Sequence, residues 1–171
     1  MILTSELEQK LDSHDGEPED ERNLGGHLVV LALYGVLVVT IAVLSAVTGR
    51  DLPRRMNTRD LLLAAVAVHK LSRTITKDAV TSPLRAPFTD HEGDGGPGEV
   101  MESPKYPAGA RRSVGELLTC PFCFDVWAVS ALTVGQVFAP RPTGLCVDTL
   151  AVLTGADVLH LAYAKAQQIA G

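Results

Sequence analysis

The chain has 171 residues, of which 46% are hydrophobic, and its 20 acidic and 15 basic side chains give a formal net charge of −5. The length is that of about one domain. No basic stripe with interleaved aromatic residues is present in the sequence, which excludes the usual pattern of a nucleic-acid-binding protein. The hydrophobic residues concentrate in four stretches, 28–47, 61–68, 117–140 and 145–164, and this pattern indicates a membrane protein.

The first 27 residues are strongly acidic. Their only basic side chains are Lys10 and Arg22, and large hydrophobic residues are few. Such a segment buries too little apolar surface to offset the entropy lost on ordering. We therefore expect residues 1–27 to form a disordered acidic tail, with a docking segment for a basic partner as the alternative.

Residues 28–47 contain no charged side chain. At about 1.5 Å per helical residue, they match a hydrocarbon core of about 30 Å. A cleaved signal peptide would need a basic start and a shorter apolar run of about 7–15 residues, neither of which this sequence has. The segment is predicted to be a transmembrane anchor.

Residues 48–116 are predicted to hold an amphipathic helix followed by a cytoplasmic loop. The helix should begin at a cap formed by Asn57 or Thr58. Its uncharged run, residues 61–68, covers only about 12 Å, so we expect it to lie in the membrane interface or to insert part-way.

The loop from Thr76 to Glu116 is rich in proline and glycine, and we expect no regular structure there. Thr81–Phe88 contains two prolines. Because a residue before proline avoids the helical region, this piece is expected to be extended and to pack along the membrane surface.

Residues 117–164 are predicted to form a transmembrane helical hairpin, and residues 165–171 the C-terminal end. The first helix carries the sequence Cys120-Pro-Phe-Cys123 at its start, and a turn at Pro140–Gly144 leads to the second helix. The predicted fold is therefore all-α and integral to the membrane, with three transmembrane helices plus one interfacial or partly inserted amphipathic helix.

The distribution of basic residues predicts the orientation. If the second helix stays in the interface and the N-terminus is outside, twelve of the 15 Lys and Arg residues are cytoplasmic. If that helix crosses and the N-terminus is inside, ten are cytoplasmic and five, including Arg50 and Arg141, are outside. Both schemes place the 76–116 loop, the cysteine pair and the C-terminus in the cytoplasm.

Four sequence runs carry a resemblance to a known family: HKLSRTITKD, VTSPLRAPF, GEV-x-E and GELLTCPFC-x-x-x-W. Together they resemble an uncharacterised family of small bacterial membrane proteins, the domain of unknown function 1360, over roughly residues 69–164. The resemblance implies a bacterial membrane protein, and we expect it in the inner membrane of the cell. It brings no activity, cofactor or catalytic residue.

The cysteine pair permits two chemistries besides simple packing. Helix-start amides stabilise a thiolate, so Cys120 could act as the nucleophile and Cys123 as the resolving thiol of a membrane dithiol oxidoreductase. A zinc site is the other alternative, with His160 and His69 completing a Cys2His2 set. Two small buried residues at a helix mouth are the structural alternative.

Charged side chains within the apolar helices require partners, because an unpaired charge at bilayer depth costs at least about 2.5 kcal/mol. Asp125 and Asp157 are the acids concerned. A salt-bridged packing core is expected, and proton or ion translocation is the alternative. The candidate partners of these acids are Arg73, His69, Arg85 and His160.

Two functional classes follow. The first is a non-enzymatic membrane scaffold or partner-binding protein with a cytoplasmic docking face formed by Thr81–Phe88 and the cysteine end. The second is the dithiol oxidoreductase or zinc site. We expect no cofactor unless zinc is bound. The expected partners are the lipid bilayer and a protein on the cytoplasmic face, with a homo-oligomer as a further alternative and no nucleic acid.

Overall fold

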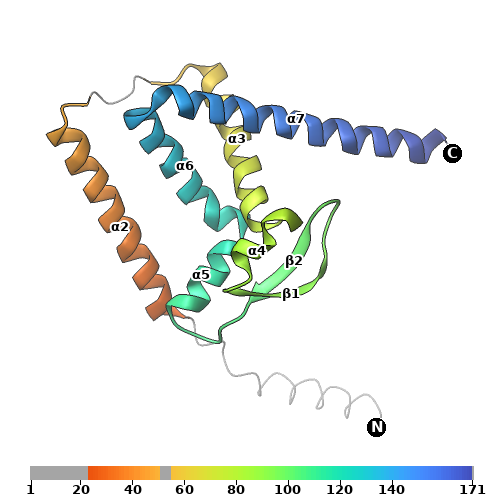
Figure 1. Ribbon diagram of the computed structural model, residues 1–171, viewed down its shortest axis with the longest axis horizontal. Coiled ribbons are helices and arrows are strands. Elements are labelled where there is room, and N and C mark those ends of the chain that lie inside the picture. Colours follow the sequence, from red (N-terminus) through yellow and green to blue (C-terminus); the bar gives the residue numbers. More distant parts are fainter. Residues whose placement is uncertain (1–22, 51–54, 171) are drawn as a thin grey trace, which may run out of the picture.

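The computed structural model describes residues 23–50 and 55–170, so the predicted acidic tail lies mostly outside the described residues. The described part is mostly helical, with one small two-stranded sheet (Figure 1). Its elements are α2 (Leu24–Val47), α3 (Thr58–Thr76), η1 (Ala79–Thr81), α4 (Ser82–Arg85), β1 (Thr89–Asp94), β2 (Val100–Pro104), α5 (Ala110–Thr119), α6 (Pro121–Phe138) and α7 (Pro140–Ala170).

Three of the described helices, α2, α6 and α7, are long and apolar enough to cross a membrane. The fourth hydrophobic helix, α3, is not among them, as the short uncharged run predicted. The three expected apolar helices are therefore present, whereas the expectation of a purely helical fold is wrong because of the sheet.

Polar contacts fix α2 at both of its ends. At its start, Asn23 Nδ2 donates a hydrogen bond of 2.9 Å to the carbonyl oxygen of Gly109, just before α5. Just past its end, Arg50 Nη1 donates one of 3.1 Å to the carbonyl oxygen of Phe138, the last residue of α6. Helices α2 and α6 consequently run in the same direction (Figure 1).

Helix α3 begins where the sequence predicted, because the Asn57 side chain accepts a hydrogen bond of 2.9 Å from the backbone N–H of Asp60. Its 19 residues span about 28 Å. It packs against α6 and α7, burying Ala67 and Ser72. It runs back from the far end of α2 toward α5 (Figure 1).

Residues 77–119, here called the polar module, contain more regular structure than predicted. Thr81–Phe88 is not extended: η1 and α4 occupy most of it. Pro83 lies in the first turn of α4, where a proline needs no backbone donor. The Arg85 side chain binds the carbonyl oxygens of Ile75 and Asp78, which draws this turn of helix onto the end of α3.

The glycine-rich part of the polar module forms an antiparallel hairpin of β1 and β2. Thr89 pairs with Pro104 at one end and Asp94 with Val100 at the other, with a bulge between His91 and Gly93. Gly93 has φ +147°, a conformation that side chains rarely allow. The glycines of this segment therefore belong to a β-hairpin and its turn, and the expectation of a loop without regular structure is wrong here.

The predicted hairpin of two long helices also differs in detail. Cys120, with φ −111° and ψ 106°, separates α5 from α6. Pro140 begins α7 directly after Ala139, because proline fits the first helical turn, so no separate turn exists at 140–144. Helix α7 diverges from α6, crosses α3 and extends past the rest of the molecule (Figure 1).

Candidate functional site

A buried ion pair holds the polar module together. Arg85 has no exposed surface, and its Nε lies 2.6 Å from Oε2 of Glu102 on β2. Its Nη1 donates to Thr81 Oγ1 at 2.7 Å and to the carbonyl oxygen of Ile75 at 2.8 Å. This one side chain therefore connects α3, η1, α4 and β2.

The carboxylate of Glu102 accepts two further hydrogen bonds, from Ser82 Oγ at 2.5 Å and Thr89 Oγ1 at 3.1 Å. Burial alone would raise the pKa of Glu102, but the hydrogen bonds from Arg85, Ser82 and Thr89 lower it below its usual value. The pair is thus charged and fully hydrogen-bonded.

A second ion pair joins α3 to the turn of the hairpin. Arg73 donates from Nε to Glu99 Oε1 at 3.0 Å, and its Nη2 contacts the same oxygen. Arg73, one of the four candidate partners of the acids in the apolar helices, is thus paired with Glu99 instead. Glu99 and Glu102 were not predicted as site residues, and both lie in the GEV-x-E run.

A cavity of about 530 Å³ is lined by residues of α3, α7 and the hairpin turn. Lys70 lies within it, with Nζ 2.9 Å from Asp157 Oδ2 and 3.6 Å from Asp78 Oδ2. The partner of Asp157 is therefore Lys70, and none of the four candidates proposed from the sequence.

We expect Asp157→Leu to lower the free energy of unfolding by no more than about 1 kcal/mol, the usual value for a partly exposed pair. The Asp157 side chain is 51% exposed, and Asp78 stays beside Lys70 after the change. Thermal unfolding in detergent measures the effect. A loss several times larger would show that Lys70 depends on Asp157 alone.

Cys120 and Cys123 lie at the joint between α5 and α6, and both thiols are free. Cys120 caps α6: its sulfur accepts a hydrogen bond of 3.3 Å from the backbone N–H of Cys123. His69 and His160 both line the cavity between α3 and α7. Within the described residues no group of three or more His, Cys, Asp or Glu is placed to hold a metal ion, so the expected Cys2His2 set is not assembled.

The cap gives Cys120 a structural role that can be tested. Cys120→Ser should keep the cap and the stability, whereas Cys120→Ala should cost about 0.5–2 kcal/mol, as loss of a helix N-cap does. Thermal unfolding of both variants is the measurement. Equal losses for Ser and Ala would mean that the thiol itself is required.

Asp125 does not form the expected salt bridge. Its Oδ1 is buried and has no hydrogen-bond partner in the described part of the chain. An acidic side chain without a partner in an apolar membrane helix costs free energy. The structure thus separates the two acids: Asp157 is paired with Lys70, and Asp125 is not.

The start of α2 is joined to α5 by a second set of contacts. His27 Nε2 lies 2.7 Å from Glu116 Oε2, and Arg112 Nε donates to Glu116 Oε1 at 2.9 Å. Burial would raise the pKa of Glu116, but the bonds from Arg112 and His27 lower it. Gly26 permits this close approach, because a Cβ there would lie 2.5 Å from Ser113 Oγ.

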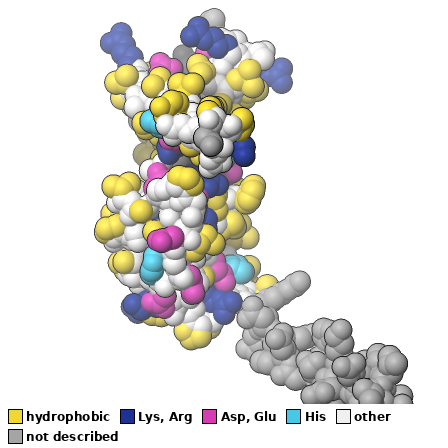
Figure 2. All heavy atoms as spheres, turned by 90° about the vertical axis from the view of Figure 1, so that its right-hand side faces the viewer, with side chains coloured by type: hydrophobic (Ala, Val, Ile, Leu, Met, Phe, Trp, Pro, Cys, Tyr) yellow, Lys and Arg dark blue, Asp and Glu magenta, His cyan; other side chains and the backbone are white. Residues whose placement is uncertain are grey.

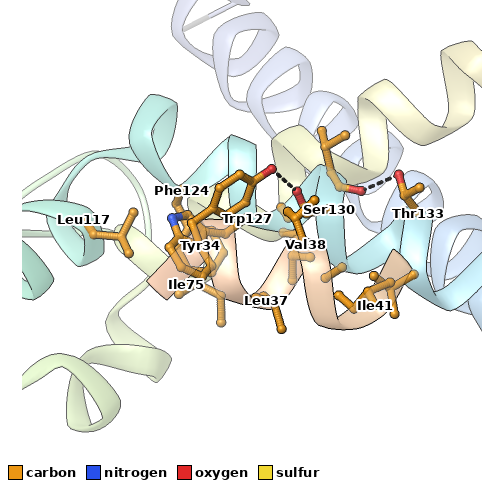
Figure 3. Close-up of a pocket in the computed structure, with 15 residues that line it drawn as sticks. Tyr34, Leu37, Val38, Ile41, Ile75, Leu117, Phe124, Trp127, Ser130 and Thr133 are labelled. Carbon is orange, nitrogen blue, oxygen red and sulfur yellow. Dashed lines mark hydrogen bonds between the residues drawn. The ribbon is translucent and has the colours of Figure 1, made fainter. Parts of the chain in front are cut away.

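An apolar groove of about 800 Å³ lies between α2, α3 and α6 (Figure 3). Leu37, Val38 and Ile41 line it from α2, and Trp127 and Ser130 from α6. The two helices touch at Tyr34, whose hydroxyl lies 2.8 Å from Ser130 Oγ and whose ring meets Trp127 edge-on at 5.2 Å.

Comparison with known proteins supports the resemblance drawn from the sequence. The model of a family described as "Protein of unknown function (DUF1360)" matches residues 62–163. The chain is 26% identical over 112 residues to "Sporulation protein YjcA" of Bacillus subtilis (strain 168), covering 64% of this chain and 95% of that protein. No solved structure matches the chain significantly.

Proposed function

The chain belongs to the DUF1360 family of proteins of unknown function, and from that premise we propose that it is a multi-pass bacterial membrane protein without catalytic activity. Its role is that of a scaffold, which holds the polar module at one face of the membrane for a protein partner. The three apolar helices support the membrane location.

The buried Arg85–Glu102 pair is the observation that carries this proposal. Arg85 is 0% exposed, so it stabilises the polar module and cannot contact a substrate. Arg73 and Glu99 likewise neutralise each other. These charged residues come from the runs HKLSRTITKD, VTSPLRAPF and GEV-x-E, and they therefore stabilise the fold of the polar module.

The contacts of Asn23 support one orientation. Because Asn23 binds Gly109, the start of α2 and the polar module lie at the same end of the molecule. With the module cytoplasmic, the N-terminus is cytoplasmic too, and α3, at about 28 Å, crosses back. Lys and Arg side chains also lie at the opposite, upper end of the molecule (Figure 2). This agrees with the scheme in which the N-terminus is inside and five basic residues are outside.

The polar module offers an apolar surface to a partner. Val80 is 81% exposed and Leu84 is 68% exposed, and the two lie four residues apart on η1 and α4. Leu84 belongs to the predicted docking face at Thr81–Phe88, and Val80 directly precedes it. The likeness to a sporulation protein supports placing the partner in that process.

Photo-crosslinking in intact cells tests the scaffold role. A benzophenone amino acid in place of Leu84 should give one protein adduct of defined mass, lost in a Val80→Asp variant and retained in a Cys120→Ser, Cys123→Ser variant. The same probe at Ala32, on the exposed face of α2, is the control. An adduct with lipid alone at Leu84, or loss of the adduct with the cysteines, would contradict the proposal.

A further inference from the structure

The apolar groove between α2, α3 and α6 is lined by side chains of all three helices. Along α6 it extends from Phe124 to Val134, and along α2 from Tyr34 to Ile41. Leu71 and Ile75 of α3 form its floor. Polar atoms in its lining are few and include the hydroxyls of Tyr34 and Ser130, which bind each other (Figure 3).

The length of the groove corresponds to one membrane leaflet. Phe124 and Val134 mark its two ends on α6. These positions are ten residues apart, or about 15 Å along a helix, and half of a hydrocarbon core of about 30 Å has the same depth. An extended acyl chain is therefore the apolar group that the groove fits.

A cation lies just beyond the end of the groove at Val134. The guanidinium of Arg50 is 5.4 Å from the centroid of the Phe138 ring, one helical turn or about 6 Å past Val134. The headgroup region of a bilayer lies directly outside the hydrocarbon core, and Arg50 is at this level relative to the groove. Arg50 is exposed, and its guanidinium carries five N–H donors, of which one on Nη1 binds the carbonyl oxygen of Phe138.

We propose that this groove binds one acyl chain of a phospholipid whose phosphate is held by Arg50. The inference rests on the proposed membrane location. A second copy of the chain could bring an apolar helix to the groove, but a phospholipid provides the acyl chain and the anion in one molecule.

The single tryptophan of the chain, Trp127, lines the groove and reports on its occupant. The full chain in detergent is titrated with phosphatidylglycerol that carries bromine on one acyl chain, and the quenching of Trp127 fluorescence is followed. Quenching that saturates near one lipid per chain is expected. Native mass spectrometry of the same samples gives the stoichiometry and the number of protein copies.

Three variants make the test specific. Ala131→Phe and Val38→Phe fill the groove from opposite walls and should each weaken binding by about tenfold, or about 1.4 kcal/mol. Ala32→Phe, on the opposite face of α2, is the matched control and should stay within about twofold. Arg50→Gln should weaken binding of the charged lipid by about threefold to tenfold.

The proposal is overturned if quenching does not saturate, or if the filling variants that keep their circular dichroism bind lipid as the control does. It is also overturned if Trp127 is shielded only in a dimer that Ala131→Phe dissociates, since a second copy would then cover the groove. Carbonate-resistant sedimentation with cell membranes checks the location separately. A chain that stays in the membrane fraction but binds no lipid contradicts this inference alone.

Discussion

Arg85→Met is expected to lower the free energy of unfolding by about 3–5 kcal/mol, the cost of breaking a buried ion pair from one side. The change leaves the carboxylate of Glu102, whose side chain is only 3% exposed, without its cation. It also removes the donors that serve the carbonyl oxygens of Ile75 and Asp78. Chemical unfolding in detergent, with hydrogen exchange at β1 and β2, measures the loss.

The Arg73–Glu99 pair provides the control, because the Arg73 side chain is 40% exposed. Arg73→Met should cost about 1 kcal/mol or less. The double variant Arg85→Met, Glu102→Met should recover part of the loss, since no charge is then left buried. If Arg85→Met costs no more than Arg73→Met, the polar module does not depend on the pair.

The Arg85–Glu102 pair makes the stability of the protein depend on pH. The pKa of Glu102 is lowered from 4.5 in the folded protein, so its contribution to stability is fully present above pH 4.5. This contribution is lost as the pH falls through the folded value. In the Glu102→Gln variant that part of the acid destabilisation should be absent.

Gly115→Ala is expected to lower the free energy of unfolding by about 1–3 kcal/mol through overpacking. A Cβ at this position would lie 2.7 Å from the carbonyl oxygen of Phe88 and 3.1 Å from the Cβ of Pro104. Helix α5 could then no longer contact the base of the hairpin as closely. Thermal unfolding and exchange of the hairpin amides report the change.

Gly144→Ala is the matched control, since Gly144 is also helical and a Cβ there meets nothing within 4 Å. Its effect should have the opposite sign, a gain of up to about 1 kcal/mol from helix propensity. Equal gains for both glycine variants would mean that α5 is not packed against the hairpin.

The apolar helices could be predicted because their signal is local. Residues 28–47 lie within α2, and the Asn57 cap marks the start of α3 as expected. The polar module could not be predicted in this way. Arg85 and Glu102 are separated by 17 positions and Arg73 and Glu99 by 26, and only the folded chain brings each pair together.

The candidate site was predicted less well than the helices. The Cys2His2 set requires α6 and α7 to lie side by side, and their divergence leaves Cys123 away from the cavity that His160 lines. Lys70, which follows His69 directly, was not among the predicted partners, although it is the residue that Asp157 contacts. Charge alone does not specify which cation an acid meets.

The side of the membrane on which the N-terminus lies tests the central claim most directly. Single cysteines at Ser5, Gly95 and Pro142, in a chain without its native cysteines, are labelled in intact cells with a membrane-impermeant thiol reagent. The account predicts that Ser5 and Gly95 are both protected and that Pro142 is labelled, because Asn23 and Gly109 are in contact. Labelling of Ser5 with protection of Gly95 would place the start of α2 and the polar module on opposite sides and contradict the account.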